Sequence, residues 1–151
     1  MGRTIAIASR KGGVGKTTSA VGLARKGKSV IILDCDPQHS TTISLGMKEP
    51  DKLDNTLASA MLGIINDTDF DPFAGIAQHS EGVGLLPSNN ALSGVELALV
   101  QAMSRESVLR QSVSRVKEEY DYIVLDCNPN LGLLTLNALS AADSVIVMQL
   151  N

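Results

Sequence analysis

A glycine- and lysine-rich stretch, SRKGGVGKTT, follows an apolar run near the amino terminus and could bind an anion. Backbone N–H groups of such a loop can point into one concavity, and the helix that follows adds the positive end of its dipole. Glycines let the backbone wrap closely around an anion, because a Cβ would collide or restrict the dihedral angles. The Lys16 ammonium can then reach β- and γ-phosphate oxygens, and the Thr17 hydroxyl can bind Mg²⁺. The stretch therefore predicts a binding site for a nucleoside polyphosphate.

The spacing of this stretch differs from the usual phosphate-loop pattern. Arg10 stands where the pattern G-x-x-x-x-G-K-[ST] has its first glycine. The chain has the variant K-G-G-x-G-K-[ST] instead, with an additional Lys11 before the glycines. A surface turn that happens to open a helix is the alternative interpretation, and the apolar segment before it and the helical segment after it argue against that alternative.

Acidic residues follow two apolar segments that we expect to be buried strands. Asp34 and Asp36 come directly after SVIIL, and Asp126 comes directly after YIVL. In a parallel sheet, ligands bind beyond the carboxyl ends of the strands, so these three carboxylates are expected to face the phosphate loop. Oxygen ligands of this kind suit a hard cation such as Mg²⁺. Each aspartate could alternatively form a turn by bonding its own backbone.

The elements that must position these residues alternate along the chain. We expect strands at 4–8, 29–33, 122–125 and 144–149, with two short strands within 75–87. We expect helices at 17–26, 56–65, 92–103, 105–119 and 133–141, the first of them ending at Gly27. Such alternation predicts an α/β fold with a mostly parallel, doubly wound sheet, and residues 1–151 as a single domain.

Composition narrows the class of protein. The chain has 151 residues, of which 44% are hydrophobic and 19% are charged, a composition typical of globular proteins. Its net charge of −3 argues weakly against a protein that binds nucleic acid over its whole surface. It has neither an apolar stretch near 18 residues nor a signal peptide, so we expect a cytoplasmic protein without a membrane partner. Cys35 and Cys127 form no disulfide framework and are interpreted as small strand-end residues, and His39 and His79 lack metal-ligand spacing.

Three motifs together resemble the ParA/Soj partition ATPases. They are the additional lysine of the phosphate loop, the Asp-x-Asp-Pro-Gln segment at 34–38 and the Asp-Cys-x-Pro-x-Leu-Gly segment at 126–132. This family with a deviant Walker motif also contains the cell-division regulator MinD and the nitrogenase iron protein. The resemblance covers essentially all 151 residues and roughly the amino-terminal three-fifths of a typical member. It implies a three-layer P-loop NTPase fold that is incomplete at its carboxyl end.

The resemblance also implies a role for each motif residue. Lys11 would reach the partner's phosphates across an ATP-bound homodimer, Asp36 would position the attacking water, and Asp126 would support the metal through water. The implied catalytic residues are Lys11, Lys16 and Asp36. The implied nucleotide-binding residues are Lys11, Gly12, Gly13, Val14, Gly15, Lys16, Thr17 and Thr18. The implied Mg²⁺ site is formed by Thr17, Asp36 and Asp126.

The function implied by the resemblance is that of an ATPase in chromosome or plasmid partition. It would act with ATP and Mg²⁺ as a nucleotide-dependent homodimer with a ParB-type centromere-binding partner. The complete protein would bind DNA non-specifically and associate with the nucleoid. Two alternatives remain open: a non-catalytic remnant or interaction module, and a MinD-like branch of the family.

Three features depart from the family pattern. The helix after the phosphate loop is about four residues, or roughly one turn, shorter than usual, so we expect a strained return to the sheet. Asn128 and Asn130 stand where Pro and Ser are usual, in the loop that carries the family's second switch. The sequence ends at Asn151, before the segments that complete the sheet, the adenine pocket and the DNA-binding surface in relatives. We therefore expect a weak or inactive ATPase that binds DNA poorly.

Overall fold

The computed structural model describes residues 2–9, 14–79, 82–128 and 132–148. Within them, six strands form one sheet in the order β3-β4-β2-β5-β1-β6. The strands are β1 (Arg3–Ser9), β2 (Val30–Asp34), β3 (Ala77–Gln78), β4 (Val83–Leu86), β5 (Tyr122–Cys127) and β6 (Ser144–Met148). All neighbouring pairs are parallel except β3 and β4, which are antiparallel. The mostly parallel sheet predicted from the alternating elements is confirmed.

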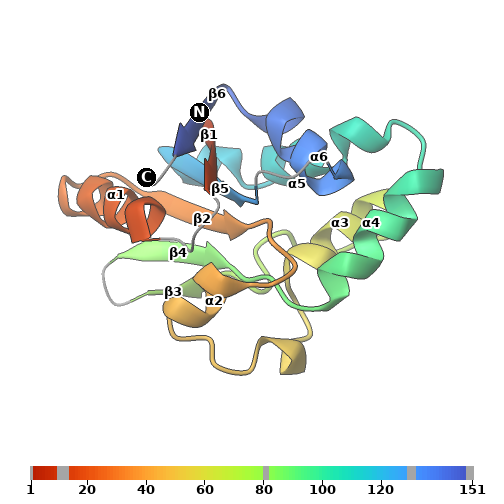
Figure 1. The fold of residues 1–151 in the computed structure, drawn as a ribbon, viewed down its shortest axis with the longest axis horizontal. Coiled ribbons are helices and arrows are strands. Elements are labelled where there is room, and N and C mark those ends of the chain that lie inside the picture. Colours follow the sequence, from red (N-terminus) through yellow and green to blue (C-terminus); the bar gives the residue numbers. More distant parts are fainter. Residues whose placement is uncertain (1, 10–13, 80–81, 129–131, 149–151) are drawn as a thin grey trace.

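Helices cover both faces of this sheet (Figure 1). The α-helices are α1 (Val14–Arg25), α2 (Ser40–Ser44), α3 (Leu57–Ile65), α4 (Ala91–Gln101), α5 (Val108–Ser114) and α6 (Leu133–Ala141). The short 3-10 helices are η1 (Pro50–Lys52), η2 (Arg105–Ser107) and η3 (Lys117–Glu119). None of the helices within the described residues is long and apolar enough to span a bilayer.

The buried residues of β2 show how the three layers are held together. Val30 and Ile32 pack in a cluster with the apolar residues of α1, whereas Ile31 and Leu33 pack with those of α3, α4, α5 and α6. This alternation follows from the two-residue period of a strand, which sends successive side chains to opposite faces. Because both faces are covered, every residue of β2 is buried. The three-layer fold is therefore confirmed.

Helix α1 returns to the sheet through a tight glycine turn. The N–H of Lys28 donates to the carbonyl of Leu23 (3.2 Å), and the N–H of Gly27 donates to the carbonyl of Ala24 (3.0 Å). Gly27 has φ +84°, the left-handed conformation that this helix ending requires. Between residues 14 and 30, no non-glycine residue has a positive φ, so the strained return expected from the short helix is not found.

The single helix expected over 105–119 is wrong, because the segment contains η2, α5 and η3 instead. Its amino-terminal part is fixed by α6, where the Asn137 side chain accepts a hydrogen bond from the N–H of Leu109 (3.0 Å). Its carboxyl-terminal part must receive the start of β1, where the N–H of Gly2 donates to the carbonyl of Lys117 (3.0 Å). A Cβ on Gly2 would lie 2.3 Å from the carbonyl oxygen of Tyr120, so this approach requires glycine.

Candidate functional site

The predicted site lies where three neighbouring strands end. Ile7 of β1 is paired with Asp126 of β5, and Asp126 is paired with Asp34 of β2. The two acids therefore lie side by side at the carboxyl edge of the sheet, next to the strand from which the glycine-rich stretch departs. That stretch connects β1 to α1, so the strand–loop–helix order expected for a phosphate loop is present (Figure 1).

Part of the predicted phosphate loop lies outside the described residues. This part includes Lys11, Gly12 and Gly13. Val14, Gly15 and Lys16 form the first turn of α1, and only their backbone is described. Their assigned roles in nucleotide binding therefore stay predictions.

The hydroxyl of Thr17 is the first described side-chain group of α1 that bears on metal binding. Its oxygen is buried and has no hydrogen-bond partner among the residues that the structure describes. A buried hydroxyl without a partner is costly, so such a group indicates a ligand or water that satisfies it. A Mg²⁺ ion fits this position because it prefers oxygen ligands. Thr18, which follows in α1, is exposed.

Asp34 is fully buried at the end of β2 and serves its own chain. Its Oδ2 accepts hydrogen bonds from the N–H (2.9 Å) and the hydroxyl (2.7 Å) of Thr42. Its Oδ1 accepts a third bond from the N–H of Asp36 (3.1 Å). These three bonds hold α2 and the loop after β2 against the sheet. The bond from the N–H of Asp36 is the turn that the alternative interpretation expects for Asp34.

Asp36 lies two residues beyond the end of β2 and is half-buried. Its Oδ1 accepts a hydrogen bond from the N–H of Gln38 (3.0 Å), which fixes the orientation of the carboxylate. Its backbone carbonyl accepts a bond from the hydroxyl of Ser88 (2.7 Å), in the segment after β4. The loop that carries Asp36 is thus supported by two strands, β2 and β4.

Asp126, at the penultimate position of β5, is buried and interacts with α2. Its Oδ2 accepts a hydrogen bond from the hydroxyl of Thr41. Sequence reasoning assigned Asp126 to this edge but missed Thr41, Thr42 and Ser88, which bind the acids or their backbone. The only signal for the threonines is their position just after Asp-Pro-Gln, and nothing in the sequence indicates which carboxylate each would reach.

Burial and a neighbouring charge alter the acidity of Asp34. Removal from water raises the pKa of Asp34 to about 6, the hydrogen bond from the Thr42 hydroxyl opposes this rise, and the negative charge of Asp126 adds to it. In the unfolded chain the pKa of an aspartate is about 4. Between these two pH values, the native state holds a proton that the unfolded chain has already lost.

We therefore expect Asp34 to reduce stability as pH rises. Its contribution to the free energy of unfolding is most favourable below about pH 4 and falls by about 3 kcal/mol by pH 7. Asp34→Asn removes the titration, so its free energy of unfolding relative to the unsubstituted protein should increase by about that amount between pH 4 and pH 7. Urea denaturation at intervals across this range measures the difference.

Asp121 provides a control of opposite sign. Hydrogen bonding to the backbone N–H of Ser29 holds the pKa of the exposed Asp121 carboxyl below its usual range. Asp121→Asn should therefore lose stability relative to the unsubstituted protein as pH rises. A difference between Asp34→Asn and the unsubstituted protein that does not change with pH would contradict the prediction.

The two cysteines are buried core residues: Cys127 is the last residue of β5, and Cys35 follows directly after β2. The N–H of Cys35 donates to the carbonyl of Asp126 (2.9 Å), which places Cys35 beside Cys127. A hydrogen bond with the Cys127 thiol, together with burial, holds the pKa of Cys35 well above its usual range. A thiol with a raised pKa is a poor nucleophile. This placement agrees with their interpretation as small strand-end residues.

Clusters of strong metal ligands are missing from the part of the chain that the structure describes. No group of three or more His, Cys, Asp or Glu side chains there could hold a metal ion. His39 uses its Nδ1 in a 2.9 Å contact with the carbonyl of Pro37. The predicted set of Thr17, Asp36 and Asp126 has only two carboxylates and a hydroxyl, so any Mg²⁺ held there would need further ligands.

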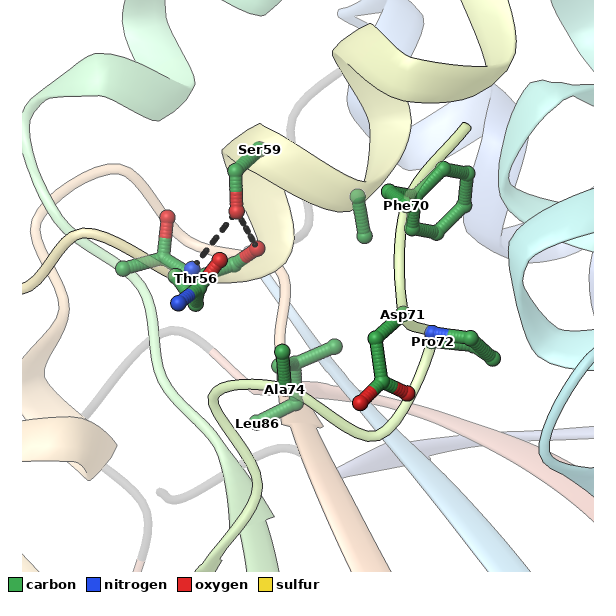
Figure 2. Close-up of a pocket in the computed structure, with 9 residues that line it drawn as sticks. Thr56, Ser59, Phe70, Asp71, Pro72, Ala74 and Leu86 are labelled. Atoms are coloured by element: carbon green, nitrogen blue, oxygen red, sulfur yellow. Dashed lines mark hydrogen bonds between the residues drawn. The ribbon is translucent and has the colours of Figure 1, made fainter. Parts of the chain in front are cut away.

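A separate cavity lies beside the amino end of α3 (Figure 2). Its volume is about 40 Å³, which is well below the several hundred Å³ of typical ligand pockets. The Ser59 hydroxyl accepts a bond from the N–H of Thr56 and donates one to its carbonyl, both 2.8 Å. Asp71 accepts a bond from the N–H of Phe73 (2.9 Å). These polar groups serve local turns, and the cavity contains none of the predicted site residues.

Known proteins match this chain over nearly its whole length. A family model described as an AAA domain matches residues 2–150. The sporulation initiation inhibitor protein Soj of Bacillus subtilis is 43% identical, over 97% of this chain and 58% of Soj. The chromosome partitioning protein ParA of Myxococcus xanthus is 41% identical, over 97% of this chain and 52% of ParA. The similarity to ParA and Soj proteins that the motifs indicate is confirmed.

Solved structures of other proteins also share this fold. Cobyrinic acid a,c-diamide synthase from Mycobacterium smegmatis, with bound ATP analog and magnesium, has a TM-score of 0.85 at 39% identity. The alignment covers 97% of this chain and 59% of that one. A putative plasmid partition protein from Borrelia burgdorferi bound to AMPPNP has a TM-score of 0.75 at 31% identity, over 97% of this chain and 62% of that one. The chain thus spans less than two thirds of these relatives.

Proposed function

Because the chain belongs to this AAA-domain family, we propose that it binds ATP with Mg²⁺ and hydrolyses ATP in chromosome or plasmid partition. Similarity to Soj and ParA supports the partition role. The diamide synthase is named for a different activity, but its structure contains magnesium and an ATP analog, which agrees with the ATP and Mg²⁺ proposed for this chain. The nucleotide part of the proposal therefore has the broader support.

The buried Thr17 hydroxyl is the structural observation that carries the proposal. It lies in the first turns of a helix that follows a glycine-rich loop, where backbone N–H groups favour phosphate. When bound, Mg²⁺ neutralises charge on the phosphates. Thr17 and the carboxylates of Asp36 and Asp126 hold it, directly or through water. The remaining nucleotide contacts come from Lys11, Gly12, Gly13, Val14, Gly15, Lys16 and Thr18.

The other residues of the site act by position and charge. Lys16 carries the positive charge directed at the β- and γ-phosphates, and Asp36 orients the water that attacks the γ-phosphate. The hydrogen bond from the N–H of Gln38 keeps the Asp36 carboxylate in one orientation and leaves its negative charge unpaired by this contact. Residues 1–151 form one nucleotide-binding unit in this proposal.

Dimerisation is the part of the proposal that involves a second copy of the chain. Lys11 reaches the nucleotide of the partner, so ATP joins two protomers. In the complete protein, the dimer binds DNA non-specifically, associates with the nucleoid in the cytoplasm and meets a ParB-type centromere-binding partner. Similarity to the partition proteins supports these proposals.

Light scattering with and without Mg-ATP tests the dimer and its lysine. We expect the protein to be monomeric alone and dimeric with Mg-ATP, whereas Lys11→Ala should bind Mg-ATP and stay monomeric, because its target lies in the other protomer. Lys26→Ala is the matched control, since Lys26 is an exposed lysine just after the last residue of α1. Normal dimerisation of Lys11→Ala would show that Lys11 does not act across the interface.

Binding assays with Mg-ATP, duplex DNA and anionic vesicles separate the alternatives. A protein that binds no Mg-ATP would be a non-catalytic remnant or interaction module, and the proposed function would be wrong. An ATP-bound dimer that binds anionic vesicles and not duplex DNA would indicate the MinD-like branch instead.

A further inference from the structure

Two adjacent threonines of α2 bind the two buried acids at the strand ends. The Thr42 hydroxyl and N–H donate to Asp34 of β2, and the Thr41 hydroxyl donates to Asp126 of β5. Both threonines are buried: the exposed fraction is 2% for Thr41 and 0% for Thr42. Successive residues of a helix point about 100° apart, and neighbouring strands lie about 4.8 Å apart. One short helix can therefore reach two paired strands with consecutive side chains.

The same helix is connected to the loop that carries Asp36. The Thr42 hydroxyl accepts a bond from the N–H of Ser88 (2.9 Å), and the Ser88 hydroxyl donates to the carbonyl of Asp36 (2.7 Å). Asp36 in turn donates its N–H to Asp34 (3.1 Å). Because α2 has only five residues, its position depends on these bonds more than on helical propensity. Thr41 is the member of this network that reaches Asp126.

We propose that Thr41 is a positioning residue that orients the Asp126 carboxylate for Mg²⁺ and ties it to the Asp36 loop. The inference rests on the proposed function, which assigns Asp126 to support of the metal. A carboxylate that is fixed by a hydrogen bond supports a metal-bound water better than one that is free to rotate. Thr42 differs in role, because its bonds go to Asp34, a residue that holds the fold.

The inference predicts a loss that depends on Mg²⁺. Removing an outer hydrogen-bond partner typically costs tenfold to a hundredfold in metal affinity or activity. Thr41→Val keeps the shape of the side chain and removes its hydroxyl. We expect Thr41→Val to bind ADP in the presence of Mg²⁺ about tenfold more weakly, and to bind ADP in EDTA as the unsubstituted protein does.

Calorimetric titration with ADP, in Mg²⁺ and in EDTA, is the experiment. Thr41→Ser retains the hydroxyl and should restore the Mg²⁺-dependent affinity. Ser44→Ala is the matched control in the same helix, because the Ser44 hydroxyl donates only to the carbonyl of Thr41 (3.0 Å) and lies on the exposed side. Thermal denaturation of each variant accompanies the titrations, so that an unfolded variant is recognised. If Thr41→Val is unfolded, the Mg²⁺-dependent affinity of Thr41→Ser is compared with that of the unsubstituted protein, and a loss in Thr41→Ser would overturn the inference.

The possible outcomes are distinct. An equal loss of affinity in Mg²⁺ and in EDTA, or an equal loss in Thr41→Val and Ser44→Ala, would show that Thr41 merely supports the fold and would overturn the inference. Unchanged affinity of Thr41→Val in Mg²⁺ would also overturn it. If the unsubstituted protein binds ADP in neither condition, the proposed nucleotide site itself is wrong, and the role of Thr41 falls with it.

Discussion

Lys16→Ala is expected to abolish measurable binding of Mg-ATP. A bound triphosphate would concentrate negative charge at the proposed site, and in the proposed function Lys16, in the first turn of α1, supplies the positive charge that meets it. Backbone N–H groups and the helix dipole persist in the variant, but together they supply only partial charge. Calorimetric titration with Mg-ATP should therefore show a clear binding curve for the unsubstituted protein and none for the variant.

Lys26→Ala is again the control, because it removes the same charge from an exposed position just beyond the last residue of α1. It should bind Mg-ATP normally. Binding by Lys16→Ala that equals binding by Lys26→Ala would show that the glycine-rich stretch is not a triphosphate site. Thermal denaturation of both variants should confirm that each one is folded before the titrations are compared.

Asp36→Ala is expected to leave ATP bound but unhydrolysed. In the proposed function the Asp36 carboxylate orients the attacking water and helps to hold Mg²⁺, whereas Lys16 and the backbone N–H groups contact the phosphates. Loss of the carboxylate should therefore slow turnover by about a hundredfold or more, while Mg-ATP stays bound. Phosphate release measures turnover, and titration measures binding. Asp36→Asn keeps an acceptor for the N–H of Gln38 and removes the charge, so it should show the same separation of binding and turnover.

Asp69, an exposed acid in the turn after α3, provides the control for nonspecific effects of charge removal. Asp69→Ala should turn over ATP at the normal rate. Normal turnover by Asp36→Ala would remove Asp36 from the reaction. Loss of both binding and turnover would show instead that Mg-ATP cannot bind without the Asp36 carboxylate, and the expected separation of binding from turnover would be wrong.

Much of the fold could be predicted from local sequence signals. The continuous apolar runs at β2 and β5 identified strands that are covered on both faces, and α6 has the bounds that its sequence indicates, Leu133–Ala141. The broken helix at 105–119 could not be predicted, because its ends depend on Asn137 and Gly2, which are distant in sequence. Tertiary contacts decided that segment against a favourable local pattern.

The candidate site divides in the same way. Strand-end aspartates could be placed at one edge, since parallel strands share a direction, and Asp34 and Asp126 are indeed paired there. The partners of these acids could not be predicted, because α2 is too short to leave a periodic pattern in the sequence. Which threonine meets which acid depends on the packing of α2 over two strands.

The order of strands in the sheet has a consequence for how the chain is made. Among the strands that the structure describes, β1 lies between β5 and β6, which begin at residues 122 and 144. Such distant pairings are formed late, because a long loop must be closed before they are gained. During synthesis, the residues Ala6, Ile7 and Ala8 therefore lack the strands with which they pair until β5 and β6 have been made. The strand that leads into the glycine-rich stretch, although it is translated first, can therefore be paired in the sheet only after residues 122–148 have been translated.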